Sequence, residues 1–114
     1  MENNTACSDV THCPVEATLS VIGGKWKALI LFHVTSAPRR FNELRRLLPS
    51  VTQRMLTQHL RELESDGILH REVRAQVPPH VEYSLTAKGL TLVPILDAMA
   101  TWGSLNGNRR TIPA

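Results

Sequence analysis

Apolar residues recur every three or four positions over most of this 114-residue chain, which is the spacing of amphipathic helices. The pattern predicts a first helix from Pro14 to Ile22, because proline suits the first helical position and the GG pair that follows favours a helix end. A second helix is expected over 25–35. The segment SAPRRF then breaks the helix and leaves a short extended piece at Arg40-Phe41.

A short third helix is expected over 42–48. Its leucines, Leu44, Leu47 and Leu48, are expected to face inward. Pro49 stops this helix, because proline cannot supply the backbone N–H that a continuing helix needs. The next helix must therefore follow a tight turn.

The fourth helix begins close to this turn. Ser50-x-x-Gln53 has the form of a capping box, and Thr52 is the alternative N-cap. With about 3.6 residues per turn, leucines fall within a narrow arc and polar residues cover the opposite side. The leucines are Leu56, Leu60 and Leu63, and the polar residues are Arg54, Thr57, Gln58 and Arg61. The glycine of the SDG segment ends the helix.

Two segments after this helix alternate between apolar and polar residues, LHREVRA and HVEYSL, as expected of strands. The QVPP loop between them gives a β-hairpin with an exposed tip. Thr86 caps a last helix that runs to about Trp102 and bends at Pro94. The predicted fold class is mainly α with a small β-hairpin (α+β): a helix-turn-helix followed by a wing.

Length and composition favour one domain. We expect a flexible N-terminal arm over 1–12, a winged helix-turn-helix domain over 13–103 and a C-terminal tail over 104–114. The polar start MENNTACSDV lacks the build of a signal peptide, and no apolar run approaches membrane-spanning length. These features predict a cytoplasmic protein without a membrane partner.

The net charge of +3 is mild, but the positive charge is concentrated. The segment from Arg39 to Arg61 contains six arginines and no lysine, against one acid, Glu43. Arginine favours phosphate and base-edge contacts, so this segment predicts a nucleic-acid site rather than a merely solvated surface.

An α-helix fits the DNA major groove, where arginine can form two hydrogen bonds with guanine and glutamine two with adenine. The first half of the fourth helix is expected to enter the groove, while Arg61 is expected nearer to phosphate. The expected contacts with double-stranded DNA are Arg39, Arg40, Arg45, Arg46, Thr52, Gln53, Arg54, Thr57, Gln58, Arg61, Arg74 and His80.

Three segments show a family resemblance: CPVEATLSVIGGKWKALIL, RRFNELRRLLPSVTQRMLTQHLRELESDGIL and VPPHVEYSLTAKG. Together they resemble the HxlR-type winged helix-turn-helix family of bacterial transcription regulators from Cys13 to about Gly103. The resemblance implies a winged-helix fold, a homodimer and an operator near the regulated genes. It indicates neither the target genes nor whether this protein represses or activates them.

The last helix is apolar on both sides, which one small domain covers poorly. A second subunit would cover it, together with the first helix. A monomer with a deeply buried last helix is the alternative. The expected dimer-interface residues are Val15, Leu19, Leu92, Ile95, Met99 and Trp102.

Cys13 directly precedes Pro14 and so lies at or next to the N-cap of the first helix, where the helix dipole favours a thiolate. Some regulators of the family sense quinones, aldehydes or oxidants through a cysteine at this CP position. The hypothesis is that Cys13 is a redox sensor and Cys7 a resolving or accessory thiol. The alternative is a small N-cap residue with ordinary reactivity.

Other chemistry is less well supported. Cys7, His12 and Cys13 match no closed zinc motif, so neither a metal nor a cofactor is expected. An enzyme is not expected, because the chain has no C-x-x-C motif and no cofactor-binding glycine-rich loop. Two alternative functions stay open: a winged-helix regulator controlled by a non-covalent small ligand, and a protein-interaction module that does not bind DNA.

Overall fold

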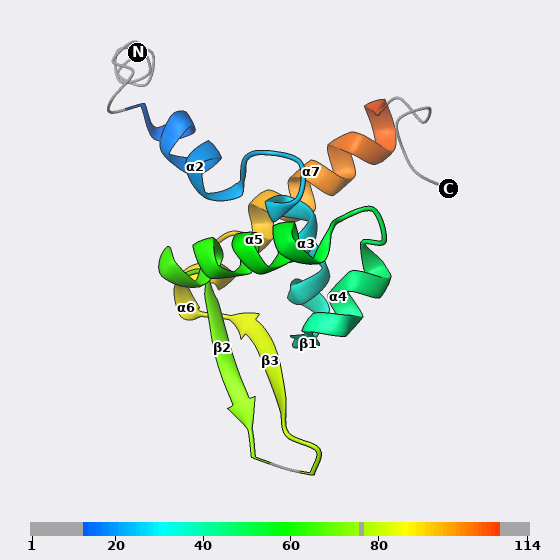
Figure 1. Ribbon diagram of the computed structural model, residues 1–114. Helices are drawn as coiled ribbons and strands as arrows, with labels where there is room; N and C mark the ends of the chain where they lie inside the picture. The colour runs from blue at the N-terminus through cyan, green and yellow to red at the C-terminus, as the bar shows by residue number, and fades with distance from the viewer. Residues whose placement is uncertain (1–12, 76, 108–114) are drawn as a thin grey trace.

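The computed structural model describes residues 13–75 and 77–107, and Figure 1 shows how their helices and strands are arranged. The elements in chain order are α2 (Pro14–Ile22), α3 (Lys27–Ser36), β1 (Arg39–Arg40), α4 (Phe41–Leu47), α5 (Gln53–Ser65), β2 (Leu69–Arg74), β3 (His80–Leu85), α6 (Ala87–Leu90) and α7 (Val93–Asn106). This order confirms the predicted mainly α fold with a small β-hairpin.

The hairpin belongs to a three-stranded antiparallel sheet with the order β1-β3-β2. The two long strands pair from Leu69 opposite Leu85 to Arg74 opposite His80, and their loop projects away from the helices (Figure 1). The extended piece after α3 begins one residue earlier than predicted, because Phe41 is already the first residue of α4.

The core is built from buried side chains of α3, α4 and α5, together with residues at the end of α2, the start of β2 and α7. The three leucines predicted to face inward on α5 are fully buried, which confirms the period of this helix. Leu44 on α4 and Leu48 at its C-cap are buried, but Leu47 is 39% exposed, so the prediction that Leu47 faces inward was wrong. A helix of two turns buries one narrow stripe, and positions four apart share that stripe more closely than positions three apart.

The predicted single C-terminal helix is two helices in the structure. Thr86 does cap the first of them: its hydroxyl accepts a hydrogen bond from the backbone N–H of Gly89 at 2.9 Å. Pro94 does not bend a continuous helix, because it lies in the first turn of α7, where its missing N–H costs nothing. The helix continues to Asn106, past the expected domain end at residue 103.

The two helices that bracket the chain, α2 and α7, extend from the same end of the molecule, opposite the hairpin (Figure 1). None of the described helices is long and apolar enough to cross a membrane.

Candidate nucleic-acid interface

The start of α5 is set by Thr52. Its backbone is extended, at φ −76° and ψ 156°, and its hydroxyl accepts a hydrogen bond from the N–H of Met55 at 3.1 Å. Of the two N-caps that the sequence allowed, the structure therefore uses Thr52 rather than Ser50. The cap fixes where the helix begins, and so fixes which side chains of its first two turns face outward.

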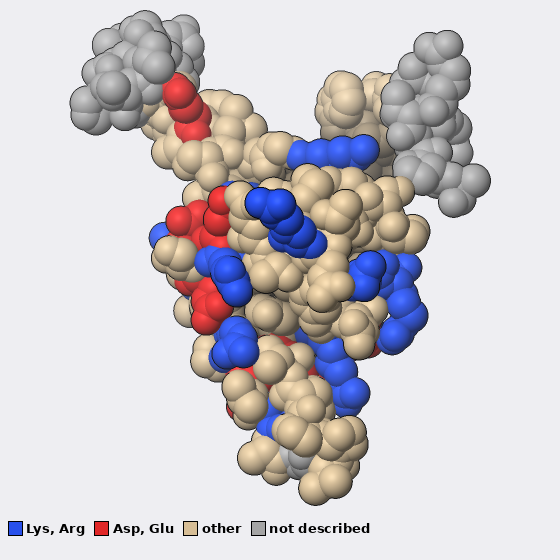
Figure 2. Space-filling model, viewed as in Figure 1, with Lys and Arg blue, Asp and Glu red and all other residues tan. Residues whose placement is uncertain are grey.

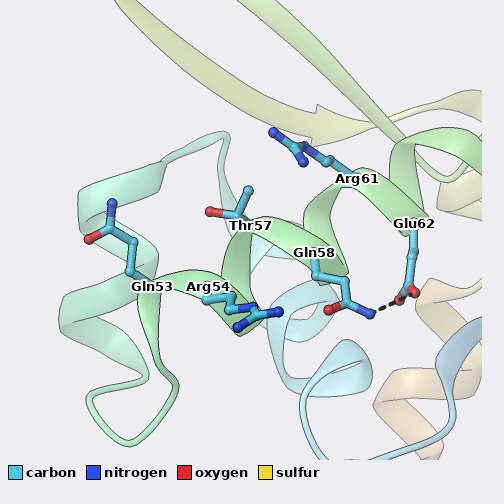
Figure 3. Close-up of a pocket in the computed structure, with 6 residues that line it drawn as sticks. All are labelled: Gln53, Arg54, Thr57, Gln58, Arg61 and Glu62. Atoms are coloured by element: carbon cyan, nitrogen blue, oxygen red, sulfur yellow. Dashed lines mark hydrogen bonds between the residues drawn. The ribbon is translucent and has the colours of Figure 1, made fainter.

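The outward face of α5 forms a shallow surface hollow of about 700 Å³ (Figure 3). Two rows of side chains four residues apart line it: Gln53, Thr57 and Arg61 form one row, and Arg54, Gln58 and Glu62 form the other. The first five of these residues were predicted to contact DNA, and the structure brings them together on one face. This face is rich in groups that can donate two hydrogen bonds in a plane.

Glu62 is a residue of this face that the sequence analysis missed. Its Oε1 lies 2.9 Å from Nζ of Lys27 on α3 and 3.4 Å from Nδ1 of His59, while its Oε2 lies 3.4 Å from Nε2 of Gln58. The hydrogen bond from Lys27, then those from Gln58 and His59, lower the pKa of Glu62, so this carboxylate is ionised at neutral pH.

The spacing of Gln58 and Glu62 on one helix could have been noticed in the sequence. The pairing of Glu62 with Lys27 could not, because it depends on how α3 packs against α5. Sequence spacing reports on neighbours within a helix, not between helices.

Basic side chains surround the face of α5. Figure 2 shows them over α4 and α5, with acidic side chains gathered toward the C-terminal end of α5. Arg40, Arg45 and Arg46 are exposed on or beside α4. Glu43 accepts a hydrogen bond from the backbone N–H of Arg40 at 2.9 Å, so this acid stabilises the first turn of α4.

Arg39 has structural contacts within the chain. Its Nε donates to the backbone oxygen of His33 at 2.9 Å and its guanidinium donates to the hydroxyl of Ser36 at 3.0 Å. A carboxylate oxygen of Glu43 lies 3.9 Å away. These contacts join the end of α3 to β1, so a phosphate would compete with them for Arg39.

The two predicted DNA contacts on the wing share one acid. Arg74 Nε and His80 Nε2 each lie 3.2 Å from an oxygen of Glu82, and Arg74 also lies 3.5 Å from Glu72. The hydrogen bond from His80 and that from Arg74 lower the pKa of Glu82. On the wing, Arg74 and His80 therefore lie beside acidic side chains and do not form a purely basic surface.

Cys13 is the N-cap residue of α2, as predicted, with an extended backbone at φ −66° and ψ 122°. Its side chain is 9% exposed. Cys7 and His12 lie outside the described residues. Among residues 13–75 and 77–107, no group of three His, Cys, Asp or Glu side chains could hold a metal ion.

Five of the six predicted dimer-interface residues are exposed apolar side chains of α2 and α7: Val15, Leu19, Ile95, Met99 and Trp102. Leu92 differs, because it is 8% exposed and belongs to the core of its own chain. Leu92 lies four residues before the buried Leu96 and so shares the inward side of α7, whereas Ile95 and Met99 face outward.

The model of the HxlR-like helix-turn-helix family matches residues 21–111. The uncharacterized HTH-type transcriptional regulator YybR of Bacillus subtilis (strain 168) is 63% identical over 94 residues, which are 82% of this chain and 75% of YybR. YdeP of the same strain, an uncharacterized HTH-type transcriptional regulator, is 59% identical over 95 residues, 83% of this chain and 74% of its own length.

Two solved structures are also similar. The redox regulator HypR in its oxidized form is 61% identical, with a TM-score of 0.81 over 84% of this chain and 99% of that one. The reduced form of the transcriptional regulator YodB from B. subtilis is 34% identical, with a TM-score of 0.72 over 82% of this chain and 93% of that one. The chain therefore belongs to the HxlR-like helix-turn-helix family of DNA-binding transcription regulators, which are not enzymes.

Proposed function

We propose that this transcription regulator binds its operator as a homodimer through the exposed face of α5, and that modification of Cys13 changes this binding. The observation that most supports the proposal is the α5 face itself. Exposed arginine and glutamine side chains lie together there with the half-buried Thr57, between a basic helix and a wing.

The proposed base contacts come from the side chains of the first two turns of α5. Gln53, Arg54, Thr57 and Gln58 all lie in this part of the helix, which is the part that enters the major groove in helix-turn-helix proteins. Arg61 lies one turn farther along, where a phosphate contact is favoured. The exposed arginines of α4 supply further phosphate contacts, which position the helix without selecting sequence.

The apolar surface of α2 and α7 favours the homodimer. In addition to its exposed side chains, α7 forms an apolar hollow of about 300 Å³ with α3. The residues that line it are Ala28, Leu29, Phe32, Leu96, Met99 and Ala100. Exposed apolar patches of this kind mark association surfaces in small proteins.

The proposed sensor, Cys13, lies at the start of α2, on the same helix as part of this apolar surface. An adduct or a disulfide at Sγ would add bulk at a side chain with little exposed surface. In a dimer that uses α2, the displacement of this helix would alter the separation of the two recognition helices. The similarity to HypR, a redox regulator, supports this proposal. A non-covalent ligand that acts through the same helices is the second candidate.

The test is a fluorescence-anisotropy titration with DNA from upstream of the protein's own and neighbouring genes. Wild type and Cys13→Ser are compared reduced and after a quinone or peroxide, across a salt series. We expect specific, salt-sensitive binding that treatment abolishes in wild type only. Binding insensitive to treatment would contradict the thiol switch and favour a non-covalent ligand. An absence of specific binding would contradict the DNA-reading assignment of α5.

A further inference from the structure

Glu62 has two oxygens with different partners. Lys27 and His59 contact Oε1, at 2.9 and 3.4 Å, whereas Oε2 faces the side-chain nitrogen of Gln58 at 3.4 Å. Lys27 is largely buried and belongs to α3, so the carboxylate is tied to the body of the domain rather than to α5 alone. Figure 3 shows the resulting row along the face of α5: Arg54, Gln58 and then Glu62.

The chemistry of this contact determines how the amide of Gln58 is turned. An ionised carboxylate only accepts hydrogen bonds, so it attracts the amide N–H and repels the amide oxygen. The lowered pKa of Glu62 keeps it ionised at neutral pH. The amide nitrogen of Gln58 is therefore directed toward Glu62, and its oxygen is directed away from Glu62.

We infer that Glu62, anchored by Lys27, is a specificity-determining positioning residue that fixes the amide of Gln58 in the orientation that adenine requires. The inference rests on the proposed function, in which Gln58 contacts a base. One N–H of the amide is used by Glu62. The second N–H and the oxygen remain as a donor and an acceptor side by side.

This pair matches adenine and does not match guanine. Adenine presents an acceptor at N7 and a donor at N6 in the major groove, whereas guanine presents two acceptors, N7 and O6. An unrestrained glutamine can turn its amide to donate to guanine. A glutamine restrained by Glu62 would instead direct its oxygen at O6 of guanine, so the restraint increases discrimination between the two bases.

The experiment compares dissociation constants for the operator and for a set in which each base pair is replaced in turn. The position that Gln58 contacts is the one where Gln58→Ala loses its base preference. At this position we expect wild type to prefer adenine over guanine by about tenfold or more. Glu62→Ala should remove most of this adenine preference, and Lys27→Met should remove part of it. Glu62→Gln retains an acceptor oxygen, so it should reduce the preference less than Glu62→Ala does.

The decisive control is the double variant Gln58→Ala/Glu62→Ala. If Glu62 acts through Gln58, adding Glu62→Ala to Gln58→Ala leaves the ratio unchanged. Loss of a negative charge strengthens binding to all sequences alike, so it cancels in the ratio. Thermal unfolding of each variant establishes that it is folded.

Two results would overturn the inference while leaving the proposed function intact. The first is an adenine-to-guanine ratio in Glu62→Ala equal to that of wild type. The second is that Glu62→Ala changes this ratio by the same factor in wild type and in Gln58→Ala. The inference would also be overturned if wild type binds the operator specifically but Gln58→Ala changes the base preference at no position. If wild type binds no sequence specifically, the proposed function itself fails, which is a different and recognisable result.

Discussion

His33 shows how burial changes the chemistry of one side chain. It lies partly buried on α3, with its ring edge-on to Phe32 at a centroid distance of 6.3 Å. Burial, and then the nearby charge of Arg39, lower its pKa below the ordinary 6.5. Both effects disfavour the protonated ring in the folded state, so this histidine is neutral where an exposed one is partly charged.

The lowered pKa of His33 predicts a pH-dependent stability. As the pH falls below about 6.5, the unfolded chain takes up a proton at this residue before the folded chain does, so folding stability is lost. The contribution of the neutral His33 to folding stability is complete above about pH 6.5, and it decreases as the pH falls toward the folded-state pKa of this residue. Urea unfolding at about pH 7.5 and about pH 5.5 should show a smaller loss of free energy for His33→Asn than for wild type. An equal loss in both proteins would contradict the assignment.

Thr52 gives a second prediction at this scale. Thr52→Ala removes the acceptor for the N–H of Met55 and should lower the free energy of unfolding by about 1 kcal/mol. Thr52→Ser retains the hydroxyl and should stay close to wild type. Both are measured by urea unfolding without DNA. If Thr52→Ser is destabilised as much as Thr52→Ala, the loss comes from the methyl group and not from the cap.

At the scale of helices and strands, the sequence was most informative where a single helix was long enough for its apolar pattern to repeat. The period of leucines on α5 predicted its buried side, because a helix of 13 residues has room for several repeats. The same argument was wrong for Leu47, because α4 has only 7 residues. The apolar pattern also predicted one helix where the structure has α6 and α7, because the turn between them contains no glycine or proline.

Contacts between different helices and strands could not be predicted from the sequence. The salt bridge from Lys27 to Glu62 joins helices whose packing no local pattern specifies. The wing shows the same limit: alternation predicted both strands, but not that Arg74 and His80 would share Glu82. The polar face of α5 could be predicted because its residues belong to one helix, whereas the contacts of Glu62 and Glu82 with basic side chains of other elements could not.

The burial pattern of α5 predicts a large difference in stability between substitutions at two positions of this helix. Leu60 is 1% exposed in the core, and Met55 on the same helix is 40% exposed. Leu60→Ala should lower the free energy of unfolding by about 2–5 kcal/mol, because it removes buried methyl groups and leaves a cavity. Met55→Ala should change it by less than about 1 kcal/mol. Urea unfolding measures both, and similar losses would show that α5 does not pack as described.

At the scale of the whole molecule, six of the thirteen exposed large apolar side chains among the described residues lie on α2 and α7, the helices at the end opposite the wing. This arrangement separates the proposed association surface from the proposed DNA-binding surface. In the proposed homodimer, a change at the α2 and α7 end would alter operator binding by changing how the two copies are held relative to each other. The apolar last helix already predicted an association surface from the sequence, but that Leu92 is buried in its own chain is seen only in the structure.

The association surface is tested by placing a charge on it. Trp102 on α7 is 65% exposed, and Trp102→Glu should convert a dimer to a monomer because the carboxylate would be buried without a partner. Val73→Glu is the matched control: it also places a charge at an exposed apolar residue, but on the wing. We expect light scattering to give a dimer mass for wild type and Val73→Glu and a monomer mass for Trp102→Glu.

Operator binding by Trp102→Glu should weaken, because each half-site is then bound independently. A dimer mass for Trp102→Glu would place the interface elsewhere, and a monomeric wild type would contradict the homodimer.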